Sequence, residues 1–246
     1  MKILAIDASG LTASVAVFSE DKMLGEFTLN SKMNHSITLL PLIDKLLKSL
    51  EIEKKEIDYI AISKGPGSFT GLRIGSATAK GISFSLNKPI VAVPTLDSMC
   101  FNIAGIEPDA LICPIMNARR NQTYSGIYEM KYEKERDRYS LNILKENGAY
   151  QIEEILYALK KIGKKVIFLG DGIYVFKDII EETFGKGVLE YAFAPLHLRM
   201  QRASSVGYLA IEYIEKGILE DAYTHHPTYL RETQAERERK KKLNGD

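Results

Sequence analysis

Residues 3–8 read ILAIDA and residues 112–118 read ICPIMNA. Each stretch is an apolar run that ends near a polar residue, which is typical of a strand buried on both faces. A short turn and a second β-rich stretch follow each of them, at residues 13–17 and 123–128. This internal duplication predicts two related lobes around a cleft. Chance similarity between two β-hairpins is the alternative that the pattern leaves open.

Strands and helices alternate after both stretches. The pattern predicts buried strands at residues 57–63, 89–94 and 165–169, each leading into a helix. Strands that alternate with helices of this length pair in parallel, so we predict an α/β fold of the actin or ribonuclease-H-like kind. A segment with Gly, Pro and charged residues at 105–109 is the best boundary. The predicted division is a first lobe at 1–106, a second at 107–230 and a basic, flexible tail at 231–246.

Composition excludes several classes of protein. The 246 residues include 33 Lys and Arg and 32 Asp and Glu, which gives a formal net charge of +1. No whole-chain field therefore attracts RNA or an anionic membrane, and any RNA contact must be local or made through a partner. The chain has no apolar run near the ~20 residues of a membrane span, and its apolar N-terminal run is too short for a signal peptide. We expect a cytoplasmic protein with no membrane partner, whose two cysteines are buried free thiols.

The sharpest local pattern is GPGSFTGLRIG at residues 65–75, between a predicted strand and a predicted helix. Glycines beside a helix N-terminus favour anion binding. A Walker A loop is excluded because no Lys-Ser or Lys-Thr follows Gly71, and a dinucleotide fingerprint is disfavoured because the third glycine comes one residue late. Phosphate binding is therefore the weaker interpretation of this loop.

Small residues recur every four positions at Gly67, Gly71, Gly75 and Ala79, which gives the following helix a smooth face. Packing on the molecule's own sheet is the commoner use of such a face. The preceding helix, predicted at 36–50, is apolar around most of its girth and needs more cover than one lobe offers. We therefore predict that the two helices form half of a four-helix interface, and that a Gly75→Arg variant stays folded but no longer associates. The predicted interface residues are His35, Leu39, Leu42, Ile43, Leu46, Phe69, Thr70, Gly71, Arg73, Gly75, Thr78 and Ala79.

Asp7 and Ser9 stand where an actin-like ATPase keeps its metal-organising acid and its phosphate loop, and Asn117 occupies the matching place in the second lobe. ATP hydrolysis needs Mg²⁺ held mainly by carboxylates and phosphates, and an amide adds no charge. We therefore predict a vestigial nucleotide cleft at Asp7, Ser9, Asn117, Gly170 and Gly172. Asp7 as a hydrogen-bonding residue at a strand end, and the Gly170–Gly172 segment as a plain turn, remain open readings. The alternative function is an independent small ATPase or phosphotransferase that uses the Asp7 cleft.

The histidines support no metal site. His35, His197, His225 and His226 do not occur in H-x-x-x-H or H-E-x-x-H spacing, and no acidic cluster has ligand spacing. The sequence also lacks a Gly-x-Ser-x-Gly nucleophile elbow. We predict no catalytic residue, no metal and no cofactor for the chain itself.

Five stretches, in order over nearly the whole chain, resemble the TsaB (YeaZ) family. They are ILAID at 3–7, HSI at 35–37, GPGSFTGLRIG at 65–75, NAR at 117–119 and PTYLR at 227–231. The glycine-rich stretch is highly specific, and the shorter ones contribute mainly by their positions. The family commonly has Asp-Ala-Arg where this chain has Asn117-Ala118-Arg119, which weakens the case for nucleotide chemistry of its own.

The resemblance implies an actin/Hsp70-like fold with a reduced second lobe. It implies a non-catalytic partner of a homologous catalytic subunit, TsaD, which transfers a threonylcarbamoyl group to N6 of an adenosine in tRNA. It also implies docking of the small ATPase TsaE on the pair, tRNA binding through the complex, and a homodimer in isolation formed by the same helices. ATP and Mg²⁺ are then expected only at the level of the complex. The basic tail either adds weak tRNA phosphate contacts or is a solvated end.

Overall fold

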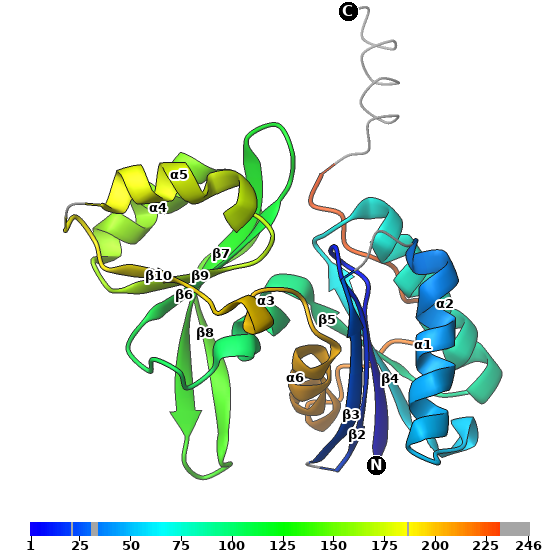
Figure 1. The fold of residues 1–246 in the computed structure, drawn as a ribbon. Helices are drawn as coiled ribbons and strands as arrows, with labels where there is room; N and C mark the ends of the chain where they lie inside the picture. The colour runs from blue at the N-terminus through cyan, green and yellow to red at the C-terminus, as the bar shows by residue number, and fades with distance from the viewer. Residues whose placement is uncertain (21, 31–33, 186, 232–246) are drawn as a thin grey trace, which may run out of the picture.

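The computed structural model describes residues 1–20, 22–30, 34–185 and 187–231, which form two lobes (Figure 1). The first sheet contains β1 (Lys2–Asp7), β2 (Ala13–Ser19), β3 (Lys22–Leu29), β4 (Tyr59–Gly65) and β5 (Ile90–Pro94). The second contains β6 (Leu111–Asn117), β7 (Gln122–Glu133), β8 (Arg138–Gln151), β9 (Val166–Leu169) and β10 (Tyr191–Phe193). The helices are α1 (His35–Ser49), α2 (Phe69–Leu86), α3 (Thr95–Cys100), α4 (Ile152–Ile162), α5 (Ile173–Phe184) and α6 (Ala203–Glu215), with short 3-10 turns η1 (Lys54–Glu56), η2 (Phe101–Ile103) and η3 (Leu196–Leu198).

The two sheets have the same strand order. It is β3-β2-β1-β4-β5 in the first lobe and β8-β7-β6-β9-β10 in the second. In each, three strands form an antiparallel meander and the last two strands run parallel to the central one. The predicted duplication and the predicted actin-like α/β architecture are confirmed. The second lobe is reduced in its helices, since α4 and α5 have 11 and 12 residues and α1 and α2 have 15 and 18.

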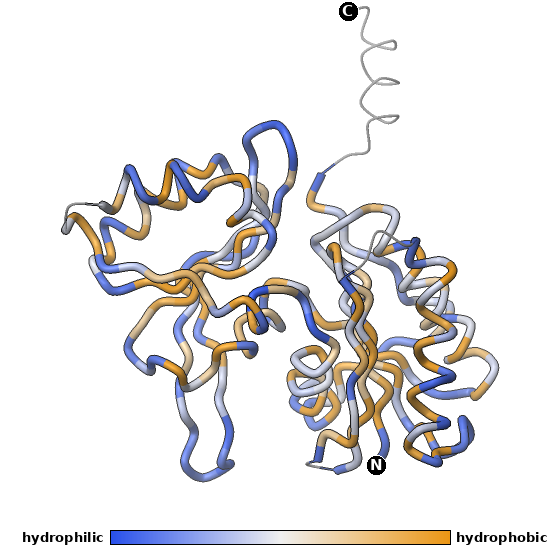
Figure 2. The backbone as a smooth tube through the Cα atoms, in the orientation of Figure 1, coloured by the Kyte–Doolittle hydropathy of each residue, from blue (hydrophilic) through white to orange (hydrophobic). Residues whose placement is uncertain are grey.

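The central strand β1 is almost wholly buried because helices cover both faces of its sheet. Leu4 and Ile6 belong to an apolar core with Leu39 of α1, whereas Ile3 and Ala5 belong to the core on the opposite face. Successive side chains of a strand point to opposite faces, so a strand covered on both sides requires a continuous apolar run. Figure 2 shows apolar segments gathered in the two sheets and polar ones at the outer turns.

Helix α6 returns from the second half of the chain to the first sheet. Ala203, Val206 and Leu209 pack with Ile3 in one core, and Figure 1 shows α6 between the two sheets. The side chain of Arg202 pairs with Glu26 of β3, and Ala203 donates its N–H to Ser14 Oγ at 2.9 Å. The division that assigned 107–230 to the second lobe did not anticipate this crossing. Without α6, the inner face of the first sheet would be exposed to water.

The chain then crosses the first lobe as a C-terminal strap, residues 218–231. Glu220 forms an isolated antiparallel bridge with Ile90 at the edge of the sheet. The carbonyl oxygen of His225 accepts from Lys80 Nζ of α2 at 3.0 Å. At the end of β4, Thr228 donates its N–H to the carbonyl oxygen of Lys64 at 2.7 Å. The predicted tail, apart from Arg231, lies outside the described residues.

Two further predictions can be compared with the structure. Cys100 and Cys113 are buried free thiols, as predicted, and burial raises the pKa of Cys113 to about 12. In the part of the chain that the structure describes, we find no helix with the length and apolarity needed to cross a bilayer.

Candidate functional site

Helix α1 presents apolar side chains on two faces. Asn34 caps its N-terminus by accepting from the N–H of Ser36 at 3.1 Å. The predicted interface residues Leu39, Leu42, Ile43 and Leu46 are buried in the core of their own lobe. Ile37 and Leu40, which the sequence analysis did not select, are 62% and 54% exposed. The first half of α1 therefore exposes apolar side chains, although they are not the ones predicted, and its second half exposes Lys45 and Lys48.

Helix α2 turns its regular small-residue face inward. Ser68 caps the helix by accepting from the N–H of Gly71 at 3.3 Å. A Cβ added at Gly71 would overlap the carbonyl oxygen of Ala8, and one at Gly75 would lie 3.2 Å from Ile62 Cδ1. Ala79 is fully buried. The prediction that Gly71, Gly75 and Ala79 receive a partner helix is therefore wrong, because these residues let α2 approach its own sheet.

The Gly75→Arg variant is therefore not a test of the interface. An arginine at Gly75 would enter the space between α2, Ile62 and Ala8 and would disturb folding itself. Of the other predicted interface residues, Thr70 and Arg73 are exposed, and Phe69 and Thr78 are half-buried. His35 is turned toward the first β-hairpin, where its Nε2 lies 3.0 Å from the carbonyl oxygen of Gly10.

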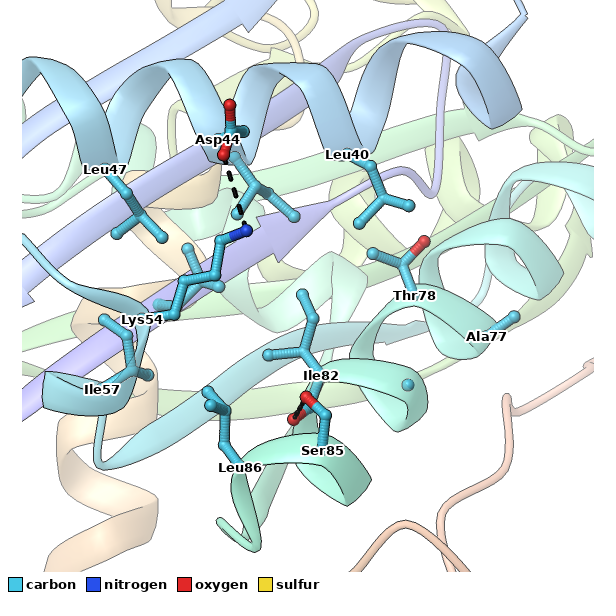
Figure 3. Close-up of a pocket in the computed structure, with 13 residues that line it drawn as sticks. Leu40, Asp44, Leu47, Lys54, Ile57, Ala77, Thr78, Ile82, Ser85 and Leu86 are labelled. Carbon is cyan, nitrogen blue, oxygen red and sulfur yellow. Dashed lines mark hydrogen bonds and ion pairs between the residues drawn. The ribbon is translucent and has the colours of Figure 1, made fainter.

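A groove of about 320 Å³ lies between α1 and α2 (Figure 3). Leu40 and Leu47 line it from α1, and Thr78 and Ile82 face them from α2. Lys54 reaches across one end and pairs with Asp44 at 3.5 Å. The groove is mostly apolar and open to solvent.

The α2 wall of this groove is a second stripe of small residues. Ala77, Gly81 and Ser85 are spaced four apart, are all exposed and line the groove, and a Cβ added at Gly81 would meet nothing within 4 Å. The sequence contains this stripe as plainly as the buried one. Spacing alone does not determine which of the two stripes packs against the sheet.

A second cavity, of about 620 Å³, lies between the two lobes. Its walls include the turn after β1, the N-terminus of α2, the turn after β6 and the end of the strap. Ser9 and Asn117 of the predicted cleft line it. Asp7, Gly170 and Gly172 do not line it.

Asp7 is fully buried and acts as a turn acceptor. Its Oδ1 accepts from the N–H of Ser9 at 2.8 Å and from Ser9 Oγ at 2.7 Å. Burial raises the pKa of the Asp7 carboxyl, against the lowering effect of the Ser9 hydrogen bonds. This geometry agrees with the strand-end reading and does not present the carboxylate to the cleft.

The matching position in the second lobe carries the same kind of turn. Asn117 Oδ1 accepts from the N–H of Arg119 at 2.8 Å, and Asp171 Oδ1 accepts from the N–H of Asn117 at 3.1 Å. Gly172 donates its N–H to Ile115 at 2.9 Å, and Gly170 has a φ of 103° that favours glycine. These contacts hold the Gly170–Gly172 turn against the end of β6.

The donor set of the cleft fits a magnesium-bound nucleotide poorly. Mg²⁺ prefers carboxylate and phosphate oxygens, yet Asp171 is the sole carboxylate among the lining residues, and one of its oxygens already accepts from Asn117. Among the described residues, no group of three or more His, Cys, Asp or Glu side chains has metal-binding geometry.

Sequence reasoning missed a group of arginines at the mouth of the cleft. Arg119 and Arg120 are exposed on the turn after β6, and Arg231, at the end of the strap, donates to the carbonyls of Ala118 and Arg119. Arg231 lies more than a hundred positions along the chain from the adjacent Arg119 and Arg120. The available signals were the NAR stretch at 117–119, which was interpreted through its amide, and the PTYLR stretch at 227–231, which ends in Arg231.

Comparisons with known proteins agree with this architecture. The family model described as "TsaD: tRNA N6-adenosine threonylcarbamoyltransferase" matches residues 22–239. The chain is 34% identical to the tRNA threonylcarbamoyladenosine biosynthesis protein TsaB of Bacillus subtilis over 96% of both chains. It is 35% identical to the TsaB of Buchnera aphidicola subsp. Schizaphis graminum over 69% of this chain and 78% of that one.

Among solved structures, YeaZ from Pseudomonas aeruginosa superposes with a TM-score of 0.76 at 22% identity, over 93% of this chain and 99% of that one. This likeness shows a shared fold. Together with the identity over nearly the full length of a curated relative, it establishes that the chain belongs to the TsaB (YeaZ) family.

Proposed function

We propose that this chain is a non-catalytic partner subunit in the synthesis of threonylcarbamoyladenosine on tRNA, and that it binds a TsaD-like catalytic homologue through the α1–α2 groove. The observation that carries the proposal is the open apolar groove, flanked by Leu40 and by the exposed stripe of Ala77, Gly81 and Ser85. The names of the relatives supply the pathway. The buried Asp7 supports the absence of a catalytic role.

The groove has the properties of an unfilled helix-packing site. Small side chains on α2 allow another helix to approach closely, and residues four apart form a continuous ridge or notch. Ile37 and Leu40 would lose water on association, and complete burial of such a side chain contributes ~1.5–3 kcal/mol. A homologous partner with the same pair of helices would complete a four-helix arrangement. Self-association through the same groove would give a homodimer in isolation, and a TsaE-like ATPase and tRNA would join at the level of the complex.

The test is co-purification of the chain with a TsaD-like protein, followed by size-exclusion chromatography. Gly81→Arg places a long charged side chain in the groove without meeting protein atoms at its Cβ, so the chain should fold and lose the partner. We expect affinity to fall by a factor of at least ~10, since a buried unpaired charge costs several kcal/mol. The transferase activity of the mixture should fall with it.

The matched control is Glu182→Arg, which adds an arginine to an exposed position on α5 of the second lobe. It should bind the partner like the wild type. Equal binding by Gly81→Arg and the wild type would exclude the groove as the interface. Robust ATP hydrolysis by the purified chain, lost in Asp7→Ala, would instead favour an independent enzyme.

A further inference from the structure

The proposed function does not use the arginines at the mouth of the inter-lobe cleft. Neither Arg119 nor Arg120 has an ion-pair or hydrogen-bond partner for its side chain among the described residues. Both side chains are exposed, and Arg119, Arg120 and Asn121 have φ values of 62°, 54° and 56°. Three successive left-handed residues other than glycine are unusual and carry a conformational cost.

The strap fixes this turn in place. Arg231 donates to the carbonyl oxygens of Ala118 and Arg119, so its guanidinium reaches from the first lobe to the second. The strap itself is anchored next to Arg231, where the ring of Tyr229 lies 4.6 Å from the ring of Phe69 on α2. The positions of Arg119 and Arg120 are therefore determined by both lobes.

The local charge at this mouth is positive although the whole chain is nearly neutral. The lining residues include Arg119, Arg120 and Arg231 and a single carboxylate, Asp171. Burial raises the pKa of the Asp171 carboxyl. Unpaired guanidinium groups beside a cavity of about 620 Å³ are suited to phosphate oxygens, which they bind with two parallel hydrogen bonds.

An aromatic surface lies beside the arginines. Tyr229 is 40% exposed, and its ring packs on Phe69, with the Arg73 guanidinium 4.0 Å from the Phe69 ring centre on the same helix. Cationic side chains that follow a phosphate backbone, next to aromatic rings on which bases stack, are the usual components of a site for single-stranded nucleic acid.

We propose that the mouth of the inter-lobe cleft binds the phosphodiester backbone of an unpaired RNA segment, with Arg119 and Arg120 contacting phosphates and Tyr229 offering a stacking surface. Guanidinium groups supply the positive charge, so the site needs no metal. The choice of RNA over free nucleotides rests on the tRNA pathway in the proposed function. The site itself does not involve the α1–α2 groove, which is lined by a later part of α2.

The experiment measures binding of a fluorescein-labelled, twelve-nucleotide single-stranded RNA to the full chain by fluorescence anisotropy at several salt concentrations. The test variant is Arg119→Gln with Arg120→Gln. The matched control is Lys134→Gln with Arg136→Gln, which removes the same charge from the exposed turn at the opposite end of β7. A third variant, Arg119→Lys with Arg120→Lys, keeps the charge.

We expect the test variant to bind RNA on the order of tenfold more weakly at low salt and to lower the salt slope by about 1 to 2, as for the loss of two phosphate contacts. The control should change affinity less than ~twofold. The lysine variant should recover most of the binding, which excludes misfolding as the cause. All variants should still bind the TsaD-like partner, so the proposal of an RNA site and the proposal of a partner groove can be disproved independently.

Several results would overturn the inference. Equal loss of RNA affinity in the test and control variants would mean that binding follows net charge alone. Equal affinity of the test variant and the wild type would exclude Arg119 and Arg120. Tighter binding of ATP than of RNA, abolished in the test variant, would identify a free nucleotide as the ligand.

Discussion

The ends of the two central strands, β1 and β6, carry the same turn with different side chains. Asp7 Oδ1 and Asn117 Oδ1 each accept from the N–H two residues further on, both at 2.8 Å. Asp7 is fully buried, whereas Asn117 is exposed at the cleft. In both lobes the residue at this position closes a turn, although the two side chains differ in burial. In neither lobe does it present a free carboxylate to the cleft.

The helices that follow β4 and β9 repeat the correspondence. Gly71 of α2 lies against the carbonyl of Ala8 just after β1, and Gly172 before α5 lies against the carbonyl of Ile115 in β6. In each lobe a glycine lets a helix approach the end of the central strand. The lobes therefore share their packing at the cleft, and they differ in the outer helices and in the strap.

The largest expected effect concerns this shared packing. Gly71→Ala should destabilise the chain by about 1–3 kcal/mol or more, because the added methyl group overlaps a backbone oxygen that cannot move freely. Gly81→Ala, on the open side of the same helix, should stabilise it by roughly 0.5–1 kcal/mol through helix propensity. Urea unfolding of both variants measures the difference, and a neutral Gly71→Ala would show that α2 does not depend on this close approach.

A smaller effect is expected at the two strand ends. Compared with Asp7→Asn, which keeps an acceptor, Asp7→Ala should lose about 1–3 kcal/mol because the buried N–H and hydroxyl of Ser9 lose their partner. Asn117→Ala should cost less than about 1 kcal/mol, since water can replace the amide at an exposed turn. Thermal and urea unfolding would check both values. Similar losses at the two sites would mean that burial does not distinguish the turns.

The smallest effect is a pH dependence of stability that comes from Asp7 at the end of β1. Because burial raises the pKa of Asp7 in the folded chain, the folded state binds its proton more tightly than the unfolded state. The contribution of Asp7 to stability is therefore present below its ordinary pKa of 3.8 and is lost as the pH rises through the raised value. The difference in stability between Asp7→Asn and the wild type should grow over that interval, and a difference that is constant with pH would contradict it.

Much of the architecture could be predicted from residues alone. The two apolar runs at 3–8 and 112–118 indicated the duplication, and the helix predicted at 36–50 lies within one residue of α1 at both ends. Strand alternation and helical periodicity are local properties, so a local pattern is sufficient to detect them. The glycine-rich stretch at 65–75 was sufficient to indicate the family.

The candidate site was predicted less completely. Both helices are present in the structure, and their role as an interface stays a prediction. Two stripes of small residues run along α2, Gly71–Gly75–Ala79 and Ala77–Gly81–Ser85, with the same spacing. The sequence selected the stripe that packs on the sheet. The exposed stripe could be identified only from the way α2 packs against its sheet.

The sequence by itself determined the repeated pattern of strand, turn and strand, the presence of α1 and α2 and the family. Only the tertiary structure decided that α6 covers the first sheet, which face of α2 is open, and that Arg231 reaches Arg119 across the cleft. The physical reason is that secondary structure follows from neighbours along the chain. Contacts between residues more than a hundred positions apart depend on which apolar faces remain to be covered once both lobes have formed.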